Sequence, residues 1–173
     1  MLSQKIQDAI NDQTNAELFS AYLYYSMAAY FESISLKGFS HWMRVQALEE
    51  MTHVQRFFSY LCDRGGQILL KTIEAPPSEW ASPLAAFEAT HEHEVGVTGL
   101  VNELMDLALA QSDHATCNFL QWFVAEQVEE EASADEIVQK LMLADKTDGG
   151  LFLLDQEMDK RTFVMPSELA GVF

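Results

Sequence analysis

Residues Glu49-Glu50-Met51-Thr52-His53 lie in the middle of a long segment with helical periodicity. Glu50 and His53 are three positions apart, so they share one face of a helix. Apolar residues at helical spacing share that face and predict that it points into a core: Phe39, Met43, Phe57 and Leu61. A buried carboxylate beside a buried imidazole is unfavourable unless a partner satisfies both, and a divalent metal ion does so. The alternative is a hydrogen-bonded pair within the core.

The composition is that of an ordinary globular domain in every respect except charge. The chain has 173 residues, of which 49% are hydrophobic and 21% charged, and this length suits one domain with a sizeable core. The net charge of −17 argues against nucleic acid or an anionic membrane as a partner and favours attraction of cations. A solvated acidic surface that only aids solubility would carry the same charge. Charge alone therefore identifies no function.

The cysteines and the N-terminal residues bear on the compartment. Cys62 and Cys117 are the only cysteines, and neither belongs to a CxxC pair, so reduced thiols in a reducing compartment are expected. The first residues lack a basic stretch followed by an apolar one, and no signal peptide is predicted. No apolar run approaches the ~18 residues of a membrane span. The sequence predicts a soluble cytoplasmic protein.

Helical periodicity covers most of the chain. Ser3 is a plausible N-cap, and Ser82 followed by proline is a strong helix start. The four long helices are predicted over about residues 3–31, 36–64, 82–111 and 112–143, with Ser112 or Asp113 as the last cap. After the break at residues 148–150, a short apolar helix is predicted over about 151–160, and the tail from residue 162 is expected to be irregular. This predicts a bundle over residues 1–160 and a C-terminal tail over residues 161–173.

The connector between the second and third predicted helices, residues 65–81, is unusually long for a compact domain. A helix of about 28 residues is ~42 Å long. An extended chain as long as this connector reaches up to ~56 Å. The connector can therefore run the length of the bundle and make the second and third helices parallel. The predicted fold is all-α, an up-down-down-up four-helix bundle with one long crossover and a short fifth C-terminal helix.

Each long helix carries an acidic residue on its apolar stripe, near the middle of its length. In an up-down-down-up bundle the four midpoints meet at one level, so these carboxylates should converge with one imidazole and one amide. The residues are Glu17, Glu50, Glu94 and Glu130, with His53 and Gln127. Carboxylates this close would force some of their number to bind protons, and two divalent ions sharing a bridging carboxylate remove that penalty. The set predicts a di-metal centre, and ligands without thiolate suit iron or manganese, with zinc also possible.

Further residues could serve this centre. Glu49, Glu126 and Glu129 lie at the edge of the same stripes and could hold a third ion, although a solvated acidic face has the same pattern. Tyr24 lies one helical face-repeat from Glu17, where it could reach the centre by a hydrogen bond or by one-electron transfer. The alternative for Tyr24 is a core tyrosine with a satisfied hydroxyl group.

Taken together, these stretches resemble bacterial non-haem ferritins over nearly the whole chain. The stretches that carry the resemblance are residues 13–17, 22–24, 49–53, Glu94 and 121–130. The resemblance implies one iron held by Glu17, Glu50 and His53. It implies a second iron held by Glu50, Glu94 and Glu130, with Gln127 close by, and a third held by Glu49, Glu126, Glu129 and Glu130. Tyr24 corresponds to the tyrosine beside the centre, and Trp122 to an aromatic residue nearby.

The resemblance also implies an activity, a set of partners and an assembly. The family oxidises Fe(II) with O2 or H2O2 and stores the ferric mineral inside a hollow cage of 24 subunits. The short fifth helix would line a fourfold axis of that cage. Its apolar residues fit such a place, because a lone bundle offers no obvious surface against which to bury them.

Departures from related families narrow the prediction. Gln127 and Glu130 stand where bacterioferritin has a second Glu-x-x-His, and Met51, which matches its haem-ligating methionine, is shared by non-haem ferritins. No haem is therefore expected. The CxxC iron module of rubrerythrin is missing, and the miniature ferritins lack this in-bundle ligand set. Two alternatives stay open: a di-iron oxygenase or peroxidase acting on an organic substrate, and a passive acidic cation-binding protein.

Overall fold

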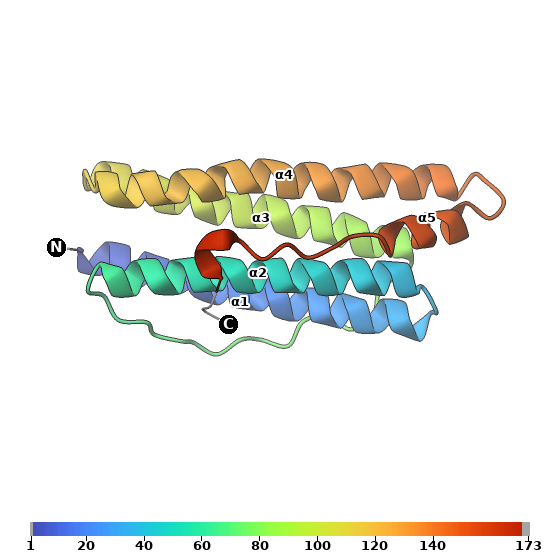
Figure 1. Cartoon of the computed structure of the whole chain (residues 1–173), viewed down its shortest axis with the longest axis horizontal. Coiled ribbons are helices and arrows are strands. Elements are labelled where there is room, and N and C mark those ends of the chain that lie inside the picture. Colours follow the sequence, from blue (N-terminus) through green and yellow to red (C-terminus); the bar gives the residue numbers. More distant parts are fainter. Residues whose placement is uncertain (1, 171–173) are drawn as a thin grey trace.

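The computed structural model describes residues 2–170, and in this part of the chain it is helical with no strand. The elements are α1 (Gln4–Ser33), α2 (Lys37–Asp63), α3 (Pro83–Ala110), α4 (His114–Ala144), α5 (Gly150–Met158) and a 3-10 turn η1 (Ser167–Leu169). Four long helices lie along one axis, and α5 packs at one end (Figure 1). Helices α2 and α3 run parallel, opposite to α1 and α4 (Figure 1). The predicted up-down-down-up bundle with a fifth helix is confirmed.

The two helical hairpins close with the same turn. Ser35 after α1 and Ser112 after α3 adopt left-handed backbone conformations, with φ of 63° and 54°. The residue after each serine donates its N–H to a carbonyl five positions back, at 3.0 Å in both hairpins, which satisfies the free end of the helix. Asp113, rather than Ser112, is the N-cap of α4, because its side chain accepts from the Thr116 N–H.

The connector lies along α1, as its length predicts (Figure 1). Asn11 donates to the Gln67 carbonyl at 3.0 Å and accepts from the Leu69 N–H at 2.8 Å. Asn15, one turn further on, donates to the Leu69 carbonyl at 3.2 Å and accepts from the Lys71 N–H at 2.8 Å. An amide side chain has both a donor and an acceptor. Each asparagine therefore satisfies one carbonyl group and one N–H group of the connector, as a neighbouring β-strand would.

The core consists of two apolar layers at opposite ends of the bundle. The α5 layer, at the end where α5 packs, includes Met27, Phe31, Phe39, Met43, Phe87, Leu141 and Leu154. The N-terminal layer, at the other end, includes Ile6, Ile10, Phe57, Leu61, Val101, Leu120 and Phe123. The apolar face predicted for the second helix is buried, and so are the four glutamates predicted on the apolar stripes, Glu17, Glu50, Glu94 and Glu130.

Helix α5 is docked on the N-terminus of α2 by a buried carboxylate. Asp155 Oδ1 accepts from the Gly38 N–H at 2.8 Å and from the Phe39 N–H at 3.1 Å. The α2 N-cap, Leu36, makes no side-chain cap, so Asp155 supplies one from the other end of the sequence. A Cβ atom on Gly38 would lie 1.7 Å from the Asp155 carbonyl oxygen, and the close approach therefore requires glycine.

The apolar residues of α5 divide between the core and the surface. Leu154 and Met158 are buried in the α5 layer. The expectation that a lone bundle has no surface for such residues is wrong for these two, because the end of the bundle between α2 and α4 receives them. Phe152 and Leu153 are each 66% exposed, so the expectation still describes the outer face of the helix.

The segment after α5 turns back along α2 (Figure 1). Residues 161–166 have no regular secondary structure, as expected, and η1 follows, where Leu169 is buried. The division of the chain at residue 160 stays a prediction, and residues 171–173 of the predicted tail lie outside the described part. Among the described helices, none combines the length and the apolar character needed to cross a membrane.

Candidate metal centre

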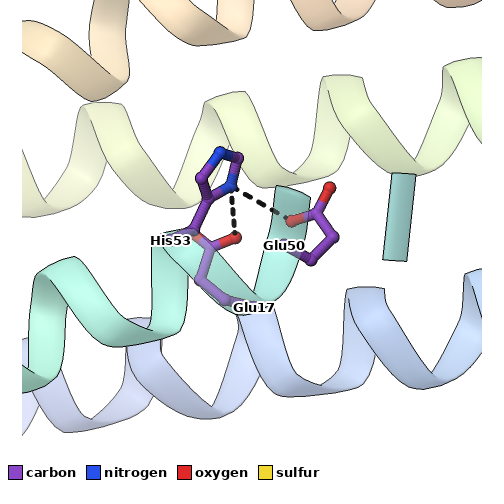
Figure 2. Close-up of side chains that lie close together, drawn as sticks. All are labelled: Glu17, Glu50 and His53. Atoms are coloured by element: carbon purple, nitrogen blue, oxygen red, sulfur yellow. Dashed lines mark ion pairs between the residues drawn. The ribbon is translucent and has the colours of Figure 1, made fainter. Parts of the chain in front are cut away.

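A layer of buried polar side chains, the polar layer, separates the two apolar layers and includes Glu17, Gln46, Glu50, His53, Glu94, Gln127 and Glu130. Side chains from α1 and α2 form its centre. His53 Nδ1 lies 3.2 Å from Glu50 Oε2 and 3.5 Å from Glu17 Oε2 (Figure 2). All three side chains are buried, and one ligand atom from each lies within 4.8 Å of the others. Glu17 Oε2 is buried without a hydrogen-bond partner. Lone pairs that converge in a dry core suit a divalent cation with oxygen and nitrogen ligands.

Two glutamines orient these carboxylates. Gln13 donates to Glu17 Oε1 at 2.8 Å, and Gln46 donates to Glu50 Oε1 at 3.1 Å. The same Gln46 amide donates to Glu130 Oε2 at 2.8 Å, so it joins α2 to α4. The sequence did not predict a role for Gln13 or Gln46. The repeated spacing of a glutamine one turn before a core glutamate, in both helices, was the available signal.

Glu94 is held from two other helices. The Tyr24 hydroxyl group donates to Glu94 Oε1, and Gln127 Nε2 lies 3.3 Å from Glu94 Oε2. Gln127 also reaches Thr98 Oγ1 at 3.3 Å. Tyr24 is fully buried, so the two alternatives for this residue coincide: it is a core tyrosine whose hydroxyl group is satisfied by a carboxylate of the polar layer.

The residues expected to hold a third ion are divided. Glu126 and Glu130 form a second group with His53, whose ligand atoms lie within 4.8 Å of one another. Glu129 is exposed and belongs to neither group. Glu49 is paired with Arg161 from the C-terminal tail, a residue that the sequence did not connect with the centre. The structure therefore groups Glu126 and Glu130 with His53, holds Glu49 in an ion pair within the electrostatic reach of both carboxylates, and leaves Glu129 exposed.

The electrostatics of the polar layer are those of carboxylates that share too few positive charges. Burial raises the pKa of Glu50 well above its usual range, although the pull of His53 opposes this. Burial, with repulsion from Glu94, raises the pKa of Glu130 to about 7. Burial alone would lower the pKa of His53, but Glu50 and Glu17 together raise it well above its usual range. Without a cation, the layer therefore holds protons that a metal ion would displace.

Aromatic rings cover the imidazole on the side of α4. The ring centroids of Trp122 and Phe123 lie 5.4 Å and 5.8 Å from that of His53, both nearly edge-on. On the α3 side, His93 Nε2 bonds the Ser20 hydroxyl group at 2.8 Å and its ring lies 5.8 Å from that of Tyr24. Burial lowers the pKa of His93, which favours a neutral ring. Trp122 and Phe123 therefore pack against His53, and His93 packs against Tyr24.

Comparison with known proteins identifies the family to which this chain belongs. The family model described as a ferritin-like domain matches residues 7–144, which is most of the chain. A bacterial non-heme ferritin of Bacteroides fragilis is 45% identical over 161 residues, covering 93% of this chain and 100% of the relative. A bacterial non-heme ferritin of Escherichia coli O6:H1 is 40% identical over 158 residues, covering 91% and 96%.

Solved structures share the fold closely. An engineered closed form of the Archaeoglobus fulgidus ferritin matches with a TM-score of 0.93 and 55% identity, covering 95% of this chain and 100% of that one. The open-pore ferritin of the same archaeon matches with a TM-score of 0.92 and 55% identity, covering 94% and 100%. At this level of identity, the likeness extends beyond the fold to the sequence.

Proposed function

The chain belongs to the ferritin family, and on that premise we propose that it is an iron-storage protein with ferroxidase activity. It oxidises Fe(II) with O2 or H2O2 at a di-iron centre within one subunit, and copies of the chain assemble into a 24-subunit cage that stores the ferric mineral. The observation that carries the proposal is the convergence of Glu17, Glu50 and His53 in the buried polar layer. The curated relatives are named as non-heme ferritins, which supports iron as the cation.

In the proposed centre, Glu17, Glu50 and His53 bind the first Fe(II). Glu50 bridges to the second, which Glu94 and Glu130 also bind, with Gln127 beside it. Glu17 Oε2 faces His53 at 3.5 Å but accepts no hydrogen bond, which supports this assignment because a cation satisfies the lone pairs that no hydrogen bond reaches. Carboxylate and imidazole ligands suit iron. No haem is proposed.

The proposed chemistry takes one electron from each of two Fe(II) ions and gives both to a single molecule of O2 or H2O2. The protein supplies positions and charge. Glutamines Gln13 and Gln46 hold two carboxylates at the geometry that binding requires, so little reorganisation remains when the ions arrive. Burial holds protons on the layer, and these leave as Fe(II) binds. Tyr24 acts on the second ion through its hydrogen bond to Glu94.

The proposed cage is supported by the surface that one subunit leaves uncovered. Phe152 and Leu153 are largely exposed on α5, and a contact between copies would bury them. The net charge of −17 suits a particle that draws in Fe(II). The nearest rival with the same charge is a passive acidic cation store, which would bind Fe(II) without accelerating its oxidation.

The initial rate of Fe(II) oxidation in a His53→Ala variant tests the proposal. We expect a loss on the order of tenfold or more, because removal of one ligand weakens the first site and its orientation. His114→Ala is the matched control, since His114 is exposed at the start of α4. An unchanged rate in His53→Ala would favour the passive store. Gel filtration tests the cage separately, and a particle with the mass of one subunit would exclude it.

A further inference from the structure

The C-terminal tail brings a positive charge to the polar layer from outside the four-helix bundle. After α5 the chain turns, and the segment from Arg161 follows the surface of α2 towards η1 (Figure 1). The His41 ring, with Nε2 as the donor, bonds the Arg161 carbonyl oxygen at 2.7 Å. Together with the Asp155 cap on α2, this contact fixes where the tail leaves α5.

Two contacts with side chains of α2 hold the Arg161 side chain in place. Its guanidinium carbon lies 4.0 Å from the centroid of the Trp42 ring, a cation–π contact, and its Nη2 donates to Glu49 Oε2. Trp42 and Glu49 are seven residues apart and therefore lie on one strip of the helix. The side chains of Arg161 and Glu49 are only 21% and 27% exposed, so water screens the pair less than it would a surface pair.

The same carboxylate is a candidate ligand of the third iron. Arg161 Nη2 already donates to Glu49 Oε2, so a cation at Glu49 has to share the carboxylate with the guanidinium group or displace it. Glu126 and Glu130, whose oxygens form a group with His53, are the other candidate ligands of this ion.

We propose that Arg161 is a built-in competitor for the third cation, holding Glu49 in an ion pair that a metal ion must break. The proposal rests on the proposed function and extends its di-iron centre to a third cation beside Glu126 and Glu130. Arg161 acts through Glu49 and is thus a positioning residue. The two-ion centre fills first, because ligand atoms of Glu17, Glu50 and His53 already converge, whereas Glu49 is held by Arg161. A third ion then releases Arg161 from Glu49 and loosens the tail from the Trp42 ring.

Titration of the assembled protein with Co(II), followed by calorimetry, tests the proposal. In Arg161→Gln we expect the weakest of three Co(II) sites per subunit to tighten on the order of tenfold, the factor of one charge-assisted hydrogen bond. Arg161→Lys restores the charge and should return the affinity towards that of the natural chain. If the arginine only anchored the tail, lysine, which lacks the planar stacking group, would behave like glutamine.

A double-mutant cycle isolates the pair. Adding Arg161→Gln to Glu49→Gln should leave the weakest site unaltered, because the competitor then has no carboxylate to hold. Arg44→Gln is the matched control, because Arg44 lies on α2, the helix that also carries Glu49, and pairs with Glu32 at an exposed position. This substitution should not affect Co(II) binding.

The outcomes separate this proposal from the proposed function. If Arg161→Gln leaves the weakest Co(II) site unchanged or weakens it while the tight pair is present, the competitor role is wrong and the di-metal centre stands. If the natural chain binds no tight pair of Co(II) but Arg161→Gln gains a site that Glu49→Gln abolishes, the proposed centre is wrong and the competitor role stands.

Discussion

In the α5 layer, the rings of Phe31, Phe39 and Phe87 pack against one another with centroids 5.2–5.9 Å apart. In the polar layer of the same bundle, Glu50 and Glu130 are also buried, but burial raises their pKa values, so these carboxyl groups favour the protonated form. Both layers follow one helical periodicity. Apolar burial stabilises the fold in proportion to area, whereas each buried carboxylate lowers stability unless a cation or donor satisfies it.

The contrast shows that stabilisation of the fold and the grouping of carboxylates fall to different layers along the bundle. The apolar layers at both ends hold four helices in register, and this rigidity lets the middle keep carboxylates close together at an energetic disadvantage. The polar layer is therefore expected to be the part of the molecule where substitutions that weaken cation binding increase the stability of the metal-free protein. Substitutions in the two kinds of layer should act with opposite sign.

The largest effect is expected in the α5 layer. Phe87→Ala should lower the free energy of unfolding by about 3–5 kcal/mol, because it leaves a cavity among fully buried rings. Urea unfolding of chelator-treated protein measures it. Phe58→Ala removes the same ring from a position that is 43% exposed and should lower the free energy of unfolding much less. Equal losses in the two variants would mean that the α5 layer does not hold the bundle together.

Glu130→Gln should act in the opposite direction. The pKa of Glu130 is raised to about 7, so the folded state binds more protons than the unfolded state between about pH 4.5 and pH 7. Stability of the metal-free protein therefore falls as pH rises through this window, and the full penalty is present above it. Glutamine removes the charge and should raise the free energy of unfolding by about 2 kcal/mol at pH 8.

The pH dependence supplies the control for Glu130→Gln. At pH 5 the native carboxyl group is protonated, and the gain should nearly vanish. Urea unfolding at both pH values, with chelator present, measures the difference. A variant that is less stable than the natural chain at pH 8 would show that Glu130 is stabilised in the metal-free layer by its bond from Gln46.

A smaller effect is expected where the α5 layer meets the N-terminus of α2. Asp155→Ala removes the acceptor for two α2 N–H groups and should lower the free energy of unfolding by about 1–2 kcal/mol. Asp159→Ala, on the exposed end of the same helix, is the matched control. Thermal unfolding compares the two. If they behave alike, α5 is held by Leu154 and Met158 and not by the cap.

The smallest effect is expected for Tyr24→Phe, at the boundary between the polar layer and the α5 layer. The ring stays packed, and only the hydroxyl group that donates to Glu94 is lost. We expect Fe(II) oxidation to slow roughly fivefold, the equivalent of one hydrogen bond. Stopped-flow absorbance measures this, with Tyr22→Phe at an exposed position as the control. A loss of many orders of magnitude would instead indicate electron transfer by Tyr24.

Much of this protein follows from local pattern. The inward stripes of α1, α2 and α4 could be predicted because helical periodicity fixes which residues share a face. The level at which Glu17, Glu50, Glu94 and Glu130 meet followed from helix lengths and from a connector long enough to make α2 and α3 parallel. The likeness to ferritins rested on the same residues.

Only the tertiary structure decided which partners these residues meet. Gln46 reaches Glu130 across 84 positions of sequence, and Arg161 reaches Glu49 across 112. Asp155 caps α2 from 117 residues away. Periodicity determines the face on which a side chain lies, but it carries no information about the distant segment that packs against that face. The sequence therefore determined the bundle and the place of its carboxylates, whereas the packing of α5 and the tail decided how Glu49 is shared.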